Sequence, residues 1–322
     1  MKQLSTKEND VLYRLKEKPA LEPFFFKKAR DLKWFDELKR RGYFTPTLAL
    51  KPSTVVDSEQ FINVPYWHAI DYLVNASKSL EITSNEHFSI ELLKIIREVT
   101  AYARDEKFSN YKVWWQFSKI IPVLPIELFD ENDINLFDFW FADSLGCELI
   151  GEELGEKWLP KLILTADQDR HELCLKLLSI IFRVHLASES DTTNSSRKVS
   201  LTVDSYRAKR IGEKISGLLG EKKKANGVKL LQASLEVILT TLDNDKWSSI
   251  WRPSIANNAQ NHSIWDTEDI VLETYRDALV SFVKADPIAS RAYVECVTSS
   301  PFITIARIGL YALNMCFVEL KD

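Results

Sequence analysis

The sequence predicts an all-α protein of the α-solenoid class, with irregular, HEAT-like helical repeats. Glycine supplies the hairpin turns, bulges and phosphate loops of β and nucleotide-binding folds. This chain of 322 residues has only 9 glycines, well below the usual ~7%. Segments with apolar residues at i, i+3, i+4 and i+7 recur, joined by short connectors that carry proline. No alternating apolar–polar run is bounded by Asn-Gly or Asp-Gly, so we expect no sheet.

One helix is marked at both ends, within the aromatic stretch FFFKKARDLKWFDELKRRGYFTP (residues 24–46). Asp31 can accept hydrogen bonds from the first backbone N–H groups, and Gly42 suits the position just after the helix. Pro46 prevents the helix from resuming. Three large side chains share one face of it: Trp34, Phe35 and Leu38. That face is too large to be buried by one helix, so helices on both sides are its expected partners.

The other helices follow from the same periodicity. The first covers 5–17 and is capped by Ser5 or Thr6, and another covers 61–77 with Pro65 in its first turn, where a missing N–H costs little. Helix starts are spaced by roughly 17 to 25 residues, without the fixed period of a regular repeat. The remaining expected helices are 84–104, 111–121, 133–146, 148–164 with a break at Pro160, 168–186, 202–219, 225–242, 267–285, one that begins at Asp286-Pro287, and 301–320.

Polar segments divide the chain. Residues 45–59 read as a polar connection, and NNAQNH (257–262) reads as a polar loop. The clearest loop is 187–200, which is small, polar and without apolar periodicity, so we expect it to be exposed. It separates two helical repeat regions, 1–186 and 201–322, which can also form one continuous solenoid.

The last expected helix, 301–320, is apolar on more than one face. A terminal solenoid helix needs a polar outer face. We therefore expect either that the chain is a piece of a longer protein or that a partner buries this helix. The residues concerned are Ile305, Ile308, Leu310, Leu313, Phe317 and Val318.

Composition points to a cytoplasmic protein. The net charge of −4 does not suggest a protein coated in nucleic acid. No signal peptide is visible at the N-terminus, and no apolar run reaches the ~18 residues that span a bilayer. The scattered cysteines read as reduced core thiols: Cys147, Cys174, Cys296 and Cys316.

Two stretches resemble a known family. The aromatic stretch at 24–46, followed by VPYWHAIDYL (64–73), resembles the helical repeat regions of large bacterial proteins with STAND- or NACHT-type NTPase modules or sirtuin-like effector modules. YRDALVSFVKADPIASRAYVECVTSSPFITIARIGLYALN (275–314) is similar to a later part of such regions, whereas 105–265 shows no match. The resemblance implies anti-phage defence, with the solenoid as sensor or scaffold and the catalytic module elsewhere. The matching residues are Phe25, Asp31, Trp34, Phe35, Leu38, Gly42, Phe44, Pro46, Pro65, Trp67, Tyr72 and Leu73.

The chain lacks the common nucleotide and calcium motifs. Gly146 and Gly151 have the first spacing of a P-loop, but two glutamates follow in place of Lys and Ser/Thr, and their carboxylates would repel phosphate. The acidic run at 130–135 lacks the register and the glycine of an EF-hand.

Two patterns that could indicate a zinc site or a nuclease have simpler structural explanations. His171 and Cys174 share a helix face and could supply two zinc ligands, with His185 farther along, but no second pair has suitable spacing. We therefore favour the simpler interpretation, a surface histidine beside a core cysteine. Glu91 and Lys94 have the E-x-x-K spacing of some nucleases, although on a helix this spacing is typical of a salt bridge. We expect no cofactor, no metal site and no catalytic residue.

Charge is distributed unevenly. Between Leu12 and Arg41 there are ten Lys/Arg and five Asp/Glu, a local +5, whereas between Glu127 and Lys157 there are ten Asp/Glu and one lysine, a local −9. These can be solvated helix faces, or surfaces for a charged partner or for self-association. The basic residues that could face nucleic acid are Lys27, Lys28, Arg30, Lys33, Arg40 and Arg41.

Adjacent aromatics give a second candidate surface. Trp114 and Trp115 cannot point to the same side of a helix, and Trp140 lies between two phenylalanines. Either both faces of these helices are buried, or one aromatic is presented to a partner, since tryptophan is frequent at binding hot spots. Trp114 and Trp140 are the candidates for such a contact.

The sequence therefore favours a non-catalytic protein-interaction, sensor or scaffold module of a bacterial anti-phage defence system. Its partner would be a phage protein or one from the same operon. Two alternatives stay open. A nucleic-acid-binding helical repeat requires the six basic residues to form one continuous surface. A hydrolase requires carboxylates and histidines that converge from separate helices.

Overall fold

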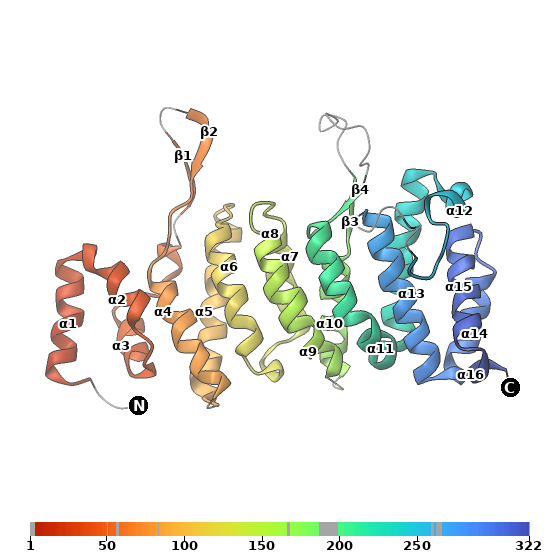
Figure 1. The fold of residues 1–322 in the computed structure, drawn as a ribbon. Helices are drawn as coiled ribbons and strands as arrows, with labels where there is room; N and C mark the ends of the chain where they lie inside the picture. The colour runs from red at the N-terminus through yellow and green to blue at the C-terminus, as the bar shows by residue number, and fades with distance from the viewer. Residues whose placement is uncertain are drawn as a thin grey trace. The chain divides into compact units, whose positions relative to one another are not determined.

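A computed structural model describes residues 4–49, 51–55, 58–82, 84–165, 168–186, 199–258, 261 and 266–321. The chain is mostly helical, so the expectation of an all-α protein is confirmed (Figure 1). It forms two compact units, Met1–Leu154 and Gly155–Asp322. Within the described ranges, no helix combines the length and apolar character needed to cross a bilayer.

The first unit consists of helices with one two-stranded ribbon. Its α-helices are α1 (Thr6–Glu17), α2 (Glu22–Lys28), α3 (Phe35–Arg40), α4 (Ala69–Ser77), α5 (Glu86–Asp105), α6 (Tyr111–Ile120), α7 (Ile134–Phe141) and α8 (Cys147–Gly151). Its ribbon is β1 (Ser53–Val55) with β2 (Ser58–Asn63). Short 3₁₀ helices are Pro19–Leu21, Leu32–Trp34, Pro46–Leu48, Lys78–Glu81, Ile121–Val123, Ile126–Leu128 and Glu131–Asp133.

The second unit begins within the π-helix Glu152–Trp158. Its other elements are α9 (Leu159–Leu164), α10 (Gln168–Ile181), β3 (Val184–Leu186), β4 (Val199–Leu201), α11 (Ser205–Leu242), the 3₁₀ helix Asp245–Trp247, α12 (Ser248–Trp251), α13 (Thr267–Ala285), α14 (Pro287–Thr298), α15 (Ile303–Met315) and α16 (Phe317–Leu320). Because α9 and α10 pack against α11, this unit starts earlier than the region 201–322 expected from the sequence.

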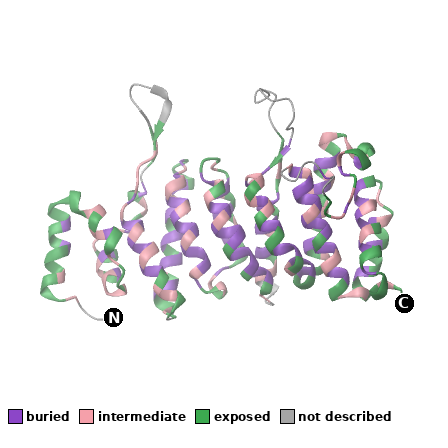
Figure 2. Cartoon of the chain, viewed as in Figure 1, coloured by how far each residue is buried: buried purple, intermediate pink, exposed green. Residues whose placement is uncertain are grey.

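Helices of the first unit contact one another in an alternating pattern. Helix α2 packs on α4, α4 on α6, and α6 on α8, while α5 packs on α7 and on the 3₁₀ helix Pro46–Leu48. Successive helices therefore fall into two layers within this unit. The core between them is apolar and aromatic. Figure 2 shows the buried stretches of these helices.

The first helix has the expected cap. Ser5 Oγ accepts from the backbone N–H of Glu8 at 3.4 Å, while the Glu8 carboxylate accepts from Ser5 N at 2.8 Å. This is a reciprocal capping box. Lys33 and Ser5 hydrogen-bond the carboxylate of Glu8, which lowers the pKa of Glu8 to about 2.

Both predicted end signals of the aromatic segment are confirmed. Asp31 accepts from Lys33 N at 3.0 Å, although it caps a 3₁₀ turn that leads into α3 and not α3 itself. Gly42 has φ +81° and donates to Lys39 O at 2.9 Å, while Tyr43 N donates to Leu38 O at 3.1 Å. These two bonds make a Schellman motif, which needs a residue with positive φ.

On the expected aromatic face, Phe35 and Leu38 are buried as expected, whereas Trp34 is only partly buried. Phe35 is fully buried and lies edge-to-face on Phe88 of α5, with ring centroids 4.8 Å apart. It also stacks on Phe44 at 5.6 Å. Phe44 in turn stacks on Tyr72 of α4 at 6.1 Å. Burial of such large rings contributes strongly to stability.

In the second unit, α11 and α13 pack closely. Gly212, Ser216 and Gly220 recur every fourth residue and are buried on the side of α11 that meets α13. A Cβ on Gly212 would lie 2.2 Å from Thr274 Oγ1. Small side chains therefore let the two backbones approach. The expected pair of helices at 202–219 and 225–242 is present, because α11 changes direction at Lys224, with φ 50° and ψ −136°.

The expectation of no sheet is wrong. Antiparallel ribbons form between β1 and β2 and between β3 and β4. The first carries a register shift between Thr54 and Val55, and in the second His185 pairs with Ser200. Each ribbon has two short strands, so the sequence shows neither long alternation nor an Asn-Gly turn. The polar connection 45–59 thus contains β1 and the start of β2.

Several helix boundaries differ as a consequence. The helix expected at 61–77 begins at Ala69, because β2 runs to Asn63 and Pro65 disfavours helical geometry in the residue before it. The helix expected at 168–186 ends at Ile181, since Val184–Leu186 pairs with β4. The loop expected at 187–200 lies outside the described residues as far as 198, and its last two residues belong to β4.

Two details of capping and interruption also differ. The helix expected to begin at residue 84 is capped by Asn85, which accepts from Phe88 N at 3.0 Å, and α5 begins at Glu86. Pro160 does not break the segment 148–164. Helix α8, the π-helix Glu152–Trp158 and α9 follow one another without a gap, and Pro160 lies in the first turn of α9.

The last helices expose part of their apolar surface. Ile303, Leu310 and Phe317 recur every seventh residue and have exposed fractions of 47%, 58% and 68%. Ile305 and Ile308, on the other side of α15, are fully buried. The expected helix with apolar residues on more than one face is therefore present, with one face packed and another exposed (Figure 2).

Candidate functional site

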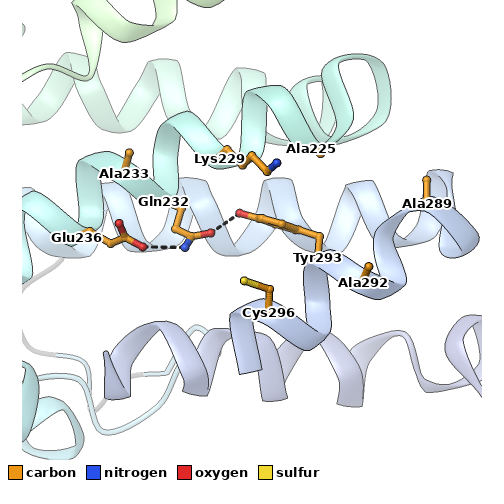
Figure 3. Close-up of a pocket in the computed structure, with 9 residues that line it drawn as sticks. All are labelled: Ala225, Lys229, Gln232, Ala233, Glu236, Ala289, Ala292, Tyr293 and Cys296. Atoms are coloured by element: carbon orange, nitrogen blue, oxygen red, sulfur yellow. Dashed lines mark hydrogen bonds between the residues drawn. The ribbon is translucent and has the colours of Figure 1, made fainter. Parts of the chain in front are cut away.

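A groove lies between the second half of α11 and α14, with a volume of about 560 Å³ (Figure 3). Its walls are rich in alanine. Its lining residues are Ala225, Lys229, Gln232, Ala233 and Glu236 from α11, and Ala289, Ala292, Tyr293 and Cys296 from α14. Both sets recur at i, i+3, i+4 and i+7, so each helix turns one face toward the groove.

A chain of hydrogen bonds fixes the polar groups of the groove. Gln232 Nε2 donates to Glu236 Oε1 at 2.7 Å, and Tyr293 OH donates to Gln232 Oε1 (Figure 3). Tyr275 OH, from α13, donates to the same oxygen at 3.2 Å. Gln232 therefore joins three helices, and its amide orientation is set by a carboxylate on one side and phenols on the other.

The phenols of this network act as neutral hydrogen-bonding groups. Burial raises the pKa of Tyr275 and of Tyr293 well above the ordinary value for tyrosine. Lys229 Nζ lies 6.0 Å from the centre of the Tyr293 ring. A tyrosine with a raised pKa is a poor base and a poor nucleophile near neutral pH. The two phenols thus supply hydrogen bonds to the groove and no activated base or nucleophile.

Cys296 is exposed and lies in the groove beside Tyr293. Cys174 and Cys316 are buried, and burial raises the pKa of the Cys174 thiol to about 12 and also that of Cys316. The expectation of core thiols is thus met for these two, but not for Cys147, which is partly exposed, or for Cys296.

The basic residues named from the sequence differ in exposure and in their ion-pair partners. Lys33 forms an ion pair with Glu8 at 2.7 Å. Arg40 and Arg41 both bind Glu37, at 2.5 and 2.7 Å. Lys27, Lys28 and Arg30 are exposed around the end of α2. Three of the six cations are thus partly neutralised by carboxylates within the same unit, which weakens the case for one continuous nucleic-acid surface made of all six.

Trp114 and Trp140 do not belong to a binding surface. Both are fully buried, and their rings stack on each other with centroids 6.0 Å apart and planes at 7°. Trp114 Nε1 donates to Ser109 Oγ at 2.9 Å and Trp140 Nε1 to Thr100 Oγ1 at 3.1 Å. With their N–H groups satisfied and no surface exposed, both tryptophans belong to the core, and the prediction that they contact a partner is wrong.

The residues considered as zinc ligands or as a nuclease pair do not form such sites. His171 faces Asn226, with Nε2 and Nδ2 3.3 Å apart, and His185 lies on β3 against Thr202. In the part of the chain that is described, no group of three or more His, Cys, Asp and Glu residues is placed to hold a metal ion. Glu91 pairs with Lys39 instead of Lys94, so the expected salt bridge along α5 is not formed.

The second unit contains a buried arginine cluster that the sequence did not predict. Arg252 is fully buried and bonds Asp269 at 2.7 Å and Glu273 at 2.9 Å. Arg276, which is also buried, donates to Ile255 O and to Asn257 Oδ1. These bonds tie the segment after α12 to α13. Neither periodicity nor a motif marks this cluster, because a loop and a helix supply it.

We expect Glu268, beside this cluster, to make stability depend on pH. Burial raises the pKa of its carboxyl to about 7, above the ~4.3 of an unfolded chain. The folded state therefore holds the proton more tightly, and its stability falls as pH rises through 7. Between pH 5 and 8 the wild type should lose about 2–3 kcal/mol more than Glu268→Gln. Urea unfolding of both proteins at both pH values measures this, and equal losses would contradict it.

Comparison with known proteins gives no assignment. No family model matches the chain, and no curated protein or solved structure matches it.

Proposed function

We propose that the chain is a non-catalytic protein-interaction module made of HEAT-like helical repeats. The observation that carries this proposal is the groove between α11 and α14, which has alanine walls and a fixed polar network. Its natural occupant is an α-helix of a protein partner. Small side chains allow close approach of a helix backbone, and helix-in-groove recognition uses anchors at i, i+3, i+4 and i+7.

The groove has the dimensions and charges for such an occupant. From Ala225 to Glu236 it follows α11 for about 16 Å, at 1.5 Å per residue, or three helical turns. Lys229 and Glu236 lie two turns apart on the same face. A partner helix with an acidic and a basic residue two turns apart would match both charges, while its apolar side chains meet the alanines.

Two other features support protein binding. Helix α15 and the start of α16 expose a row of large apolar side chains, which is typical of surfaces that pack on another protein. The alternating helix contacts of the first unit are those of a two-layer helical repeat, the basis for proposing a HEAT-like solenoid.

The biological setting in the proposal is a bacterial anti-phage defence system in the cytoplasm, where the module acts as sensor or scaffold. It rests on the resemblance of residues 24–46 and 64–73 to the repeat regions of such proteins. Phe35, Phe44 and Tyr72 of these stretches pack in the core, so the resemblance concerns packing. The catalytic module would be on another polypeptide segment or protein.

The test is a capture experiment with variants that fill the groove. The tagged chain is expressed in bacteria with and without phage infection, and bound proteins are identified by mass spectrometry. Ala292→Trp and Ala289→Trp place a large ring in the groove at exposed positions, so the fold should tolerate them. Ala285→Trp, at the exposed end of α13, is the matched control.

We expect a protein that is captured by the wild type and by Ala285→Trp but lost from both groove variants. Equal capture by all four proteins would exclude the groove as the binding site. Recovery of nucleic acid alone, lost with nuclease and at high salt, would favour the nucleic-acid-binding alternative.

A further inference from the structure

The first unit contains a second cavity, of about 510 Å³, in the range of small-molecule sites. It is formed where the end of α1, the start of α2 and the end of α3 meet. Its lining residues are Lys16, Glu22, Arg40, Arg41, Gly42, Tyr43 and Leu48. Three cations and one carboxylate therefore surround this space, and a tyrosine and a leucine add apolar surface.

Glu37 holds the two arginines in place. Its carboxylate accepts from Arg40 Nε at 2.9 Å and from Arg41 Nε at 2.7 Å. Arg41 is only 24% exposed, and among the described residues its terminal Nη groups donate to no protein acceptor. A guanidinium that is fixed through Nε, with its other N–H groups unused, is suited to bind a phosphate.

The aromatic part of the cavity is fixed as well. The Tyr43 ring packs edge-to-face on Phe26, with centroids 5.2 Å apart. Burial, and then the charge of Glu22, raise the pKa of the Tyr43 phenol, while Arg41 acts in the opposite direction. Tyr43 thus stands between the acidic and the basic sides of the cavity. A ligand that contacts the basic side, the Tyr43 ring and the acidic side has an anionic end, an aromatic or apolar body, and a polar group for Glu22.

We propose that this cavity binds a small phosphomonoester with an aromatic body. The phosphate lies among Arg40, Arg41 and Lys16, and the ring lies against Tyr43 and Leu48. Because Glu37 partly neutralises Arg40 and Arg41, the charge open to a ligand comes mainly from Lys16 and the Nη groups of Arg41. A dianionic phosphate gains more from these two contacts than a ligand with one carboxylate does. A nucleoside monophosphate and an aryl phosphate such as phosphotyrosine share this chemistry. The site belongs to the first unit and is independent of the groove between α11 and α14.

Isothermal titration calorimetry with three probes tests the proposal: inorganic phosphate, phenyl phosphate and adenosine monophosphate. At least one aromatic probe should bind the full chain more tightly than inorganic phosphate. If adenosine monophosphate binds more tightly, the natural ligand is a nucleotide. If phenyl phosphate binds more tightly, the natural ligand is a phosphorylated aromatic side chain. Equal binding of all three, or no binding, would overturn the proposal.

Variants locate the site. Arg41→Gln should weaken binding of the better aromatic probe by about tenfold or more. Lys16→Gln, at an exposed position without an ion pair among the described residues, should weaken it without affecting the fold. Arg30→Gln removes the same charge from an exposed position outside the cavity and should leave affinity unchanged. Equal weakening by all three would show general attraction of anions and would overturn the site.

Discussion

Gly220→Ala should lower the free energy of unfolding of the second unit by about 3 kcal/mol, because overpacking a close helix contact is costly. Gly220 lies on α11 where it meets α13. A Cβ at this position would lie 2.1 Å from the backbone oxygen of Ala278 and 2.7 Å from the backbone nitrogen of Phe282. These are main-chain atoms of a helix, so they cannot rotate away, and the two helices must separate.

Gly217→Ala is the matched control on the same helix. Gly217 is exposed, and a Cβ there would meet nothing within 4 Å. Replacing glycine by alanine in an exposed helix should stabilise by about 0.5–1 kcal/mol. Urea unfolding of both variants measures the difference. If Gly220→Ala is as stable as Gly217→Ala, the close packing of α11 on α13 is not as described.

Arg252→Met should destabilise the second unit by about 3–5 kcal/mol, because it leaves a buried carboxylate without its partner. Arg252 has no exposed surface, and Asp269 is 1% exposed. Asp269 Oδ1 accepts from Arg252 at 2.7 Å, while Oδ2 has no hydrogen-bond partner among the described residues. Arg252 is therefore the main compensation for this charge.

Two further variants separate charge from packing. Adding Asp269→Asn to Arg252→Met should restore part of the lost stability, because an amide costs less to bury than a carboxylate. Lys246→Met removes an exposed cation 3.8 Å from Asp243 and should change stability by no more than about 0.5 kcal/mol. If Arg252→Met unfolds at the same urea concentration as Lys246→Met, the buried pair contributes nothing.

Local signals in the sequence predicted local structure well. Helix α13 has the expected bounds, 267–285, because an uninterrupted apolar period and an acidic first turn mark it. The break between the two halves of α11 was also expected, before residue 225. Gly42 ends α3 in a Schellman motif, for which its positive φ is needed. In each case residues within one or two turns determine the outcome.

Features that depend on distant residues were missed. The pairing of β3 with β4 joins strands separated by 12 residues, and its stability comes from cross-strand bonds that no local period reveals. Arg252 lies in a loop and Asp269 in a helix. An arginine and an aspartate at this spacing match no sequence motif, so the sequence does not predict their ion pair. In the sequence the groove residues look like ordinary helix positions, because Ala289 and Ala292 form a surface only when α14 is packed against α11.

The central claim is that the groove between α11 and α14 binds a partner helix, and alkylation of Cys296 tests it most directly. Cys296 is an exposed thiol within the groove, whereas Cys147, in the other unit, is partly exposed and serves as internal reference. Iodoacetamide labelling of both residues is followed by mass spectrometry, with the chain alone and in complex with the captured protein. We predict that the complex slows labelling of Cys296 by about tenfold or more, because access limits thiol reactivity, while Cys147 is unaffected. Unchanged labelling of Cys296 in a saturated complex would contradict the claim.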